Sequence, residues 1–231
     1  MSRPRRTLPL SSLILALLPL ALLPIGANPA RAATTCQDVT GLGERVHLAA
    51  SARPNLDTHI LDVANVFTFE DLHDVILCGH SYAGMVVSGV ADRMPERIAA
   101  LVYVDAFVPN DGEAWWDLAG DYFRKLAIDG SAADGFSVNP PPSPGDARRV
   151  PHPLAAFRQA IRLTGQWQTV REKMFIYATG WDETPFTPTY ERLKADPSWI
   201  VKSLPTGHDI LGKAPEEFLK LVQALKSVAS R

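Results

Sequence analysis

The chain has 231 residues, and its 23 lysines and arginines nearly balance 25 aspartates and glutamates, for a formal charge of −2 at pH 7. Without an excess of positive charge, the chain has no electrostatic footprint for nucleic acid. The length corresponds to one domain with a sizeable hydrophobic core.

The N-terminal segment has the pattern of an export signal. Three arginines within residues 2–6 precede an almost wholly apolar run over residues 8–25, and residues 30–32 have the small-x-small form of a processing site. Prolines interrupt the run, which favours export over a membrane anchor. We therefore expect residues 1–32 to be a signal peptide, and residues 33–231 to be a secreted or periplasmic domain without a stable membrane anchor.

The sequence predicts neither a disulfide nor a metal site. Its two cysteines are Cys36 and Cys78. An oxidising compartment permits a bridge, but Cys78 lies in an apolar strand, where a thiol behaves as a small hydrophobe, so we expect both thiols to stay reduced. The histidines are scattered, with no second ligand at a metal-binding interval.

A glycine-punctuated loop and a helix precede the central stretch of the chain. The loop is Thr40-Gly41-Leu42-Gly43-Glu44-Arg45. Asp57 can cap the helix that follows, because apolar residues then recur at helical spacing. The predicted apolar face consists of Ile60, Leu61, Ala64 and Phe67.

Residues 75–87 organise the rest of the chain, because a strand there meets a helix at Ser81. Residues 75–78 are apolar and mostly β-prone, and apolar residues recur at helical spacing after the serine. The residues two before the serine and two and three after it are small: Gly79, Ala83 and Gly84. This is the pattern of a nucleophile elbow, which holds a serine in strained backbone geometry.

The next apolar run, over residues 98–104, reads as a strand buried on both faces. A strand, a helix and a second strand in this order predict a right-handed parallel crossover. The fold class that we expect is therefore α/β, with a mostly parallel sheet flanked by helices. Further strands are predicted at residues 174–179 and 199–204, and an amphipathic helix at residues 215–228.

The alternation of predicted strands and helices is interrupted between residues 109 and 150. We interpret residues 109–165 as a helical cap inserted over the site. Trp115 and Trp116 lie on a predicted helix of this cap, in front of a segment rich in proline, serine and glycine. We expect the two tryptophans to contribute an apolar substrate pocket.

A nucleophilic serine needs a base that takes its proton and a carboxylate that orients the base. His208 lies after the last predicted strand and before the closing helix, where such a base is expected. His80 is adjacent to the serine and cannot turn back onto it, so we interpret it as a pocket or packing residue. His152 belongs to the cap.

Two aspartates qualify as the acid. Asp182 follows the strand of residues 174–179, and Asp105 ends the strand that begins at residue 98. Both positions are at carboxyl ends of strands, where open α/β sheets bind ligands, and either one preserves the order serine, acid, histidine. A carboxylate that ends a buried strand is costly without a partner, which argues that Asp105 has a role. The residues themselves leave this choice open.

These motifs resemble the α/β-hydrolase superfamily, specifically the branch of small esterases that includes plant methylesterases and hydroxynitrile lyases. The resemblance covers the chain from about residue 41 and is carried by Gly79-His80-Ser81-Tyr82-Ala83-Gly84, by Gly207-His208 and by the glycine loop. It implies a serine esterase with a catalytic triad, and we expect no cofactor. The plant members carry their acid in the loop after the strand that matches residues 174–179, so the resemblance implies Asp182 as the acid. Asp105 is the alternative, because some haloalkane dehalogenases carry their acid where Asp105 stands.

The N-terminal region departs from the superfamily pattern. Superfamily members begin with strands that end in a His-Gly loop, whose backbone N–H supplies half of the oxyanion hole, and no such motif precedes the elbow here. We therefore expect an N-terminally shortened fold. The N–H of Tyr82 should supply one donor, and residues 41–44 either supply the second or leave an open gap.

The expected function is hydrolysis of small-molecule carboxylic esters by Ser81, His208 and Asp182 or Asp105, with His80 in the pocket. The alternative is a catalytically impaired or non-catalytic binding protein that lacks a working oxyanion hole. A hydroxynitrile lyase is less favoured, because family lyases carry a lysine directly after the histidine, where this chain has Asp209.

Overall fold

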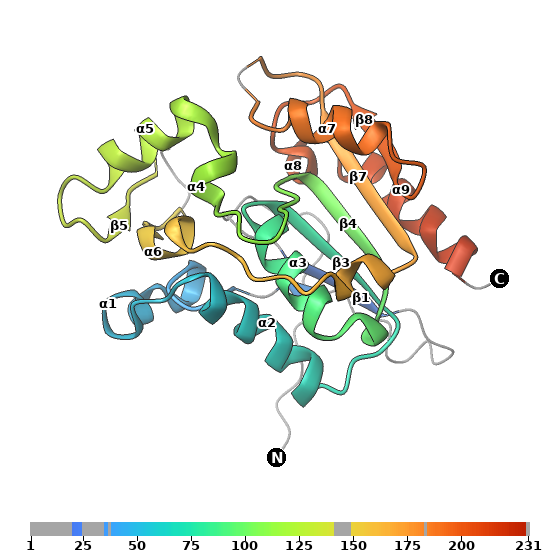
Figure 1. Ribbon diagram of the computed structural model, residues 1–231, viewed down its shortest axis with the longest axis horizontal. Helices are drawn as coiled ribbons and strands as arrows, with labels where there is room; N and C mark the ends of the chain where they lie inside the picture. Colours follow the sequence, from blue (N-terminus) through green and yellow to red (C-terminus); the bar gives the residue numbers. More distant parts are fainter. Residues whose placement is uncertain (1–19, 25–34, 37, 141–148, 183, 230–231) are drawn as a thin grey trace.

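The computed structural model describes residues 20–24, 35–36, 38–140, 149–182 and 184–229, and it has a six-stranded central sheet (Figure 1). The strand order is β2-β1-β3-β4-β7-β8. The last four of these strands are parallel, whereas β1 is antiparallel to both of its neighbours. The bounds are β1 Leu20–Pro24, β2 Thr35–Cys36, β3 Val75–Ser81, β4 Ile98–Ala106, β7 Glu172–Ala178 and β8 Ile200–Leu204. The predicted α/β class with a mostly parallel sheet is confirmed.

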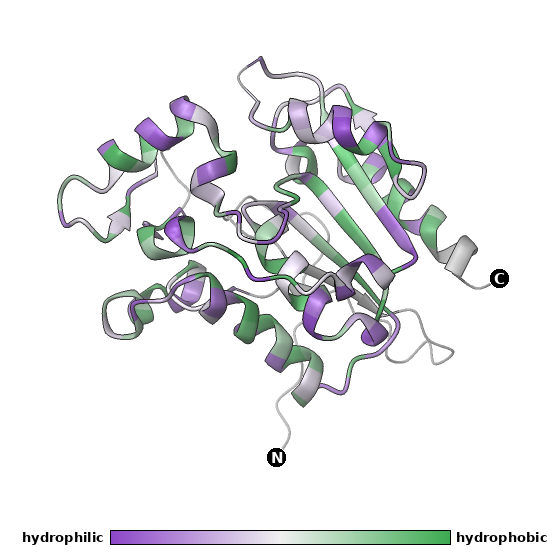
Figure 2. Cartoon of the chain, in the orientation of Figure 1, coloured by the Kyte–Doolittle hydropathy of each residue, from purple (hydrophilic) through white to green (hydrophobic). Residues whose placement is uncertain are grey.

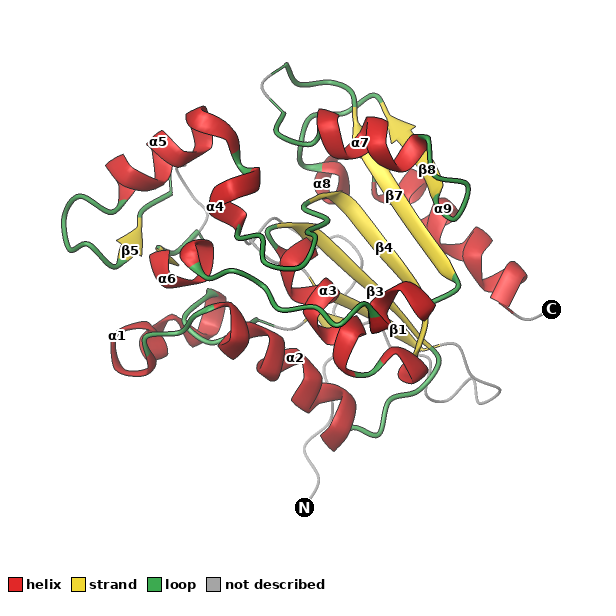
Figure 3. Ribbon diagram, in the orientation of Figure 1, coloured by secondary structure: helices red, strands yellow, loops and turns green. Residues whose placement is uncertain are grey.

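Helices cover both faces of this sheet (Figure 3). Helices α2 (Leu56–Phe69) and α3 (Ala83–Arg93) pack on one face, and α8 (Ile210–Lys213) and α9 (Pro215–Ala229) pack on the other. Helix α7 (Thr187–Lys194) lies between β7 and β8 in the chain. The remaining short helices near the N-terminal half are η3 (Gly43–Leu48), α1 (Ala49–Ala52) and η4 (Pro95–Arg97).

The central strands are apolar on both faces because each face has its own core. In β3, Val75 and Leu77 belong to the core beneath α2 and α3, whereas Ile76 and Cys78 belong to the core beneath α8 and α9. Strand β4 alternates in the same way. Figure 2 shows the resulting hydrophobic stripes along the strands. A strand buried on both faces has no polar alternation, which is why these runs read as continuous apolar segments.

Helix α2 begins one residue before the predicted cap. Asn55, not Asp57, is the N-cap: its side chain accepts from the N–H of Thr58 at 3.0 Å in a capping box. Asp57 instead forms an ion pair with Arg93 at 2.9 Å. Leu61 was expected in the apolar face but is 50% exposed, because the buried stripe runs through Leu56, Ile60 and Val63.

The segment between β4 and β7, in which the cap was predicted, lies beside the sheet in Figure 1. The helix predicted around Trp115 and Trp116 is divided into two, because Gly120 has a φ of 73°. The elements between β4 and β7 are α4 Trp115–Leu118, α5 Gly120–Gly130, β5 Ser137–Val138, β6 His152–Pro153, α6 Leu154–Arg158 and η5 Gln166–Thr169.

Five residues of the predicted signal segment form β1, which pairs antiparallel with β3 from Leu20 opposite Gly79 to Pro24 opposite Val75. The rest of the predicted signal, residues 1–19 and 25–32, lies outside the described residues. Across the described ranges, no helix combines the length and the apolar character needed to cross a bilayer.

The strand register separates the two cysteines. Ala21 in β1 lies opposite Cys36 on one side and opposite Cys78 on the other. Two strand spacings amount to roughly 10 Å, whereas a disulfide needs Cα atoms within about 7 Å. This geometry does not allow a bridge between them.

The approach of β3 to α3 explains the small residues around Ser81. A Cβ on Gly79 would lie 2.8 Å from the carbonyl oxygen of Ala83. A Cβ on Gly84 would fall on the carbonyl oxygen of Phe107, in the loop after β4. Both obstacles are backbone atoms, which cannot rotate away as a side chain can.

We expect Gly84→Ala to lower the free energy of unfolding by about 1–3 kcal/mol, the usual cost of overpacking. Urea unfolding followed by circular dichroism measures the change. Gly207→Ala is the matched control, because a Cβ at Gly207 meets no atom within 4 Å. Equal unfolding midpoints for the two variants would contradict this packing argument.

Candidate active site

Ser81 stands at a strained turn between β3 and α3. Its φ is 57°, in the left-handed region that residues other than glycine rarely adopt. The neighbouring backbone fixes the turn, since the N–H of Phe107 donates to the carbonyl of Ser81 at 3.2 Å. This is the geometry of a nucleophile elbow, which presents the serine at the carboxyl edge of the sheet.

Asp105 is an extra residue in β4. In the pairing of β3 with β4, His80 lies opposite Val104 and Ser81 lies opposite Ala106, so the register skips Asp105. The residue has a φ of 42° and is completely buried. A bulge redirects a side chain that would otherwise follow the alternation of the strand. Backbone strain of this kind is typical of functional sites.

The bulge directs the carboxylate of Asp105 to His208. Asp105 Oδ2 accepts a hydrogen bond from His208 Nδ1 at 2.7 Å, and Oδ1 accepts from the N–H of Ala178 at 3.0 Å. Asp182, the other predicted acid, is exposed in the turn after β7. In that loop it is the preceding residue, Trp181, whose ring contacts His208, with 4.9 Å between centroids. Of the two aspartates, the structure therefore joins Asp105 to the histidine.

His80 connects the elbow to the loop after β8, which carries His208. Its side chain is buried, and its Nε2–H donates to the carbonyl of His208 at 2.8 Å. The two imidazole rings lie 4.3 Å apart between centroids. Burial, followed by the proximity of His208, lowers the pKa of His80 to about 3, so the ring is neutral. His80 was predicted as a pocket or packing residue, and its contacts here are with the backbone and ring of His208.

The chain thus places Ser81 at the end of β3, Asp105 near the end of β4 and His208 in the loop after β8, and a hydrogen bond joins the last two. The Ser81 hydroxyl makes no hydrogen bond to the other residues that the structure describes. In ligand-free hydrolases, the bond from nucleophile to base commonly tightens only when substrate binds.

Burial acts on the two members of the acid and histidine pair in opposite directions. It raises the pKa of Asp105 to about 7, an effect that the hydrogen bond from Ala178 opposes. It lowers the pKa of His208 to about 4, an effect that the nearby Asp209 carboxylate opposes. Both shifts disfavour the charged form, as expected in a low-dielectric site. Above pH 7, the pair consists of an ionised carboxylate and a neutral imidazole that can accept a proton.

Aromatic side chains flank His208, whose side chain is 32% exposed, and sequence reasoning did not identify Trp181 and Phe186, which contact it. Trp181 lies against the imidazole, and Phe186 stacks on it with 5.6 Å between ring centroids. Phe107 contacts Phe186 at 4.7 Å, and Phe123 of the cap contacts Trp181 at 6.1 Å. The sequence signal that could have identified Trp181 is its position directly before Asp182, in a loop already considered for the acid of the triad.

The two predicted pocket tryptophans differ in position. Trp115 is 7% exposed, stacks on Phe157 with 4.1 Å between centroids and contacts Phe107 at 6.0 Å. Trp116 is partly buried, and the guanidinium of Arg158 lies over its ring at 4.5 Å. Trp115 therefore continues the aromatic contacts that lead to His208, whereas Trp116 contacts Arg158 of the same segment.

Most backbone N–H groups of the glycine loop, residues 40–45, already donate hydrogen bonds to acceptors in the N-terminal region. Five N–H groups bond to local acceptors: Thr40 to Asp62 Oδ2 (2.6 Å), Gly41 to Arg45 O (3.2 Å), Leu42 to Val39 O (3.0 Å), Glu44 to Asp38 Oδ2 (3.2 Å) and Arg45 to Leu42 O (2.9 Å). These amides cannot also bond to an oxyanion. The N–H of Tyr82 is the candidate donor because it lies directly after the serine of the elbow.

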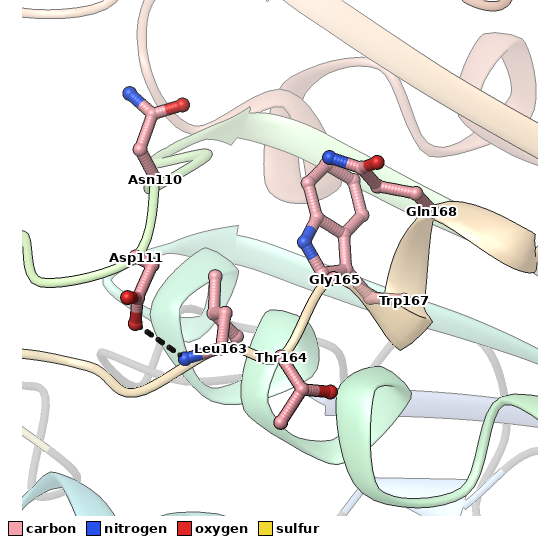
Figure 4. A pocket seen from close by; sticks show the side chains of 7 residues that line it. All are labelled: Asn110, Asp111, Leu163, Thr164, Gly165, Trp167 and Gln168. Carbon is pink, nitrogen blue, oxygen red and sulfur yellow. Dashed lines mark hydrogen bonds between the residues drawn. The ribbon is translucent and has the colours of Figure 1, made fainter.

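A separate hollow of about 240 Å³ lies between the loop after β4 and the segment that precedes β7 (Figure 4). It is lined by Asn110, Asp111, Leu163, Thr164, Gly165, Trp167 and Gln168. Asp111 stabilises its rim by accepting from the N–H of Leu163 at 2.8 Å. The lining includes neither Ser81, Asp105 nor His208, so this hollow is distinct from the candidate catalytic centre. Within the described residues, no cluster of three histidine, cysteine, aspartate or glutamate side chains could hold a metal ion.

Comparisons with known proteins identify the family of this chain. Residues 15–221 match the model of the alpha/beta hydrolase family. A carbendazim hydrolyzing esterase from Nocardioides sp. (strain SG-4G) is 35% identical over 206 residues, covering 80% of this chain and 85% of the relative.

Solved structures show the same fold at lower identity. An extracellular alpha/beta-hydrolase from a Paenibacillus species, described as a structural and functional homologue of tobacco salicylic acid binding protein 2, superposes with a TM-score of 0.68 at 19% identity. That match covers 82% of this chain and 86% of the other. Tomato methylketone synthase I superposes with a TM-score of 0.65 at 16% identity, covering 87% of this chain and 89% of the other. The chain therefore belongs to the alpha/beta hydrolase family and lies in its esterase branch, among the carboxylic ester hydrolases.

Proposed function

We propose that this protein hydrolyses small carboxylic esters through an acyl-enzyme, with Ser81 as nucleophile, His208 as base and Asp105 as the acid of the triad. The observation that carries the proposal is the 2.7 Å hydrogen bond between His208 Nδ1 and the buried carboxylate of Asp105, beside a serine at φ 57°. A histidine held in this way has its Nε2 lone pair available for the serine proton.

The reaction then follows the standard two steps of nucleophilic catalysis. Ser81 Oγ attacks the ester carbonyl carbon while His208 Nε2 takes the hydroxyl proton. The same proton passes to the leaving alcohol when the tetrahedral intermediate collapses to the acyl-enzyme. Water then attacks the acyl carbon with His208 again as base, which releases the acid and restores Ser81. The N–H of Tyr82 donates to the oxyanion in both steps.

The aromatic surroundings of His208 favour substrates with an apolar acyl or alcohol group. Trp181 and Phe186 contact the imidazole, and Phe107 connects them to Trp115 of the cap. Flat apolar groups pack well against such rings. The similarity to an esterase that hydrolyses carbendazim supports a small organic substrate for this chain.

We also propose that the protein is exported. The basic and apolar pattern of the N-terminal segment supports this localisation, as does the similarity to an extracellular hydrolase of the same fold. Because residues 20–24 form β1 of the central sheet, the exported form that we propose keeps these residues and is not cleaved after residue 32.

A second candidate function is ligand binding with little turnover. It is favoured by the five loop amides that bond within the N-terminal region, because loss of one oxyanion donor costs about 10²–10³ in rate. The two candidates differ in whether Ser81 is activated, which a covalent probe can test directly.

A fluorophosphonate probe should label the folded protein once, at Ser81, since an activated serine attacks electrophilic phosphorus. Peptide mass spectrometry identifies the labelled residue. Ser81→Ala should abolish labelling, whereas Ser51→Ala, which changes an exposed serine, should leave it intact. Labelling that persists in Ser81→Ala, or that is absent from the folded wild type, would overturn the hydrolase proposal.

Asp105→Asn should lower kcat on a p-nitrophenyl ester by about 10⁴-fold, the scale seen when the equivalent carboxylate of a serine protease is amidated. The variant should still fold, because the amide oxygen can accept from Ala178 and a buried charge is removed. Asp182→Asn is the matched control and should retain kcat within about threefold of wild type. A large loss in Asp182→Asn with an active Asp105→Asn would transfer the acid role to Asp182.

The pH profile of kcat/KM should show an acidic limb. Burial raises the pKa of Asp105 to about 7 and lowers the pKa of His208 to about 4, so the pair gains its first proton near pH 7 as the pH falls. The active form has an ionised carboxylate and a neutral imidazole. Activity should therefore be full above pH 8 and decline through an apparent pKa near 7. Activity that stays constant down to pH 5 would contradict this assignment.

A further inference from the structure

A chain of buried hydrogen bonds connects the residue after the nucleophile to the glycine loop. The hydroxyl of Tyr82 lies 3.0 Å from His59 Nδ1, and His59 Nε2 lies 3.1 Å from the carbonyl oxygen of Thr40. Asp62 continues the chain by accepting from the N–H of Thr40 at 2.6 Å and from its hydroxyl at 3.1 Å. Three segments distant in sequence, the glycine loop, α2 and the elbow, are thereby joined through one imidazole.

The direction of each bond in this chain is determined. A carbonyl oxygen only accepts, so His59 Nε2 carries a hydrogen and donates it to Thr40. Burial lowers the pKa of His59 to about 4, which keeps the ring neutral and leaves a lone pair on Nδ1. Burial also holds the pKa of Tyr82 well above its ordinary value, so the phenol keeps its proton. Tyr82 therefore donates to His59, and both imidazole nitrogens are used.

The ring of Tyr82 is also enclosed by the cap. Its centroid lies 4.7 Å from that of His152 and 5.5 Å from that of Phe157, and His152 stacks on Phe157 at 4.0 Å. Tyr82 is 2% exposed and His59 is fully buried. Packing thus holds the sides of the ring, and the hydrogen bond to His59 holds its end.

Building on the proposed esterase function, we propose that His59 is a positioning residue for the oxyanion donor: it anchors the Tyr82 side chain and so holds the Tyr82 backbone N–H in place. The role of Tyr82 in the proposed reaction depends on its amide, not on its hydroxyl. The hydroxyl acts only through the position of the backbone to which its ring is attached.

This anchoring matters because the elbow is strained. Ser81 adopts a φ of 57°, a conformation that persists only where the surrounding structure over-determines it. An anchored Tyr82 limits rotation of the peptide plane between Ser81 and Tyr82, which carries the donor N–H. A displacement of that N–H weakens its bond to the oxyanion more than it weakens the binding of neutral substrate. Loss of the anchor should therefore lower kcat while leaving KM nearly unchanged.

Three substitutions distinguish the effect of the bond between His59 and Tyr82 from the effect of the bond between His59 and Thr40. Tyr82→Phe removes the hydroxyl and keeps the ring. His59→Asn places an amide near the position of Nδ1 and can still accept from Tyr82, whereas His59→Gln reaches the position of Nε2 and can still donate to Thr40. We expect kcat on a p-nitrophenyl ester to fall about 10- to 100-fold in Tyr82→Phe and His59→Gln, part of the cost of losing a whole donor. We expect His59→Asn to stay within about threefold of wild type, and KM to change less than about threefold in all three variants.

Stability is controlled with Ile60→Val, which removes one buried methyl group from the same helix without touching Tyr82. All variants are compared by thermal melting, and kcat is measured well below each melting temperature. A wild-type kcat in Tyr82→Phe, or equal losses in His59→Asn and His59→Gln, overturns the positioning role. So does a kcat loss in Ile60→Val that matches the loss in His59→Gln.

Covalent labelling of the wild type distinguishes this inference from the function on which it rests. If the fluorophosphonate probe labels Ser81 and the ester is turned over, then variant kinetics judge the role of His59 alone. If the wild type neither reacts nor turns over ester, the esterase proposal fails first, and the positioning role fails with it.

Discussion

The site depends on one buried charge, the carboxylate of Asp105. The position is completely buried, so an unpaired carboxylate there would be costly. The structure offsets this cost with two hydrogen bonds, one from the N–H of Ala178 and one from His208. Both depend on the bulge at φ 42°, since regular alternation along β4 would direct the side chain elsewhere. The partner that makes the carboxylate tolerable is thus the residue that it would orient in the proposed reaction.

The elements of the sheet could be predicted because their signals are local. Apolar runs located β3, β4 and β7, and the small residues around Ser81 predicted the close approach that Gly79 and Gly84 make to backbone carbonyls. The choice of acid depended on non-local geometry. Both Asp105 and Asp182 follow strands at the same edge of the sheet, and only the register between β3 and β4 reveals that one of them is the extra residue of a bulge.

The aromatic contacts of His208 were beyond sequence reasoning for a related reason. Trp181 and Phe186 come from the loop after β7, and Phe107 from the loop after β4, so their contacts exist only once the sheet places these loops together. Aromatic residues in loops have no periodicity that marks them as pocket or surface. The helix cap at Asn55 was missed differently: Asp57 is also a good cap, and the competing ion pair with Arg93 is non-local.

The N-terminal loop shows how a region can support an active site without supplying a reacting group. Five of its six amides bond to Asp62, Asp38 and local carbonyls, so the loop does not offer these five to an oxyanion. Its Thr40 carbonyl instead accepts from His59, which in turn accepts from Tyr82. The more the reaction relies on a single amide, the more each error in the position of that amide reduces the rate. Rigid support behind Tyr82 is therefore the contribution that we propose for this loop.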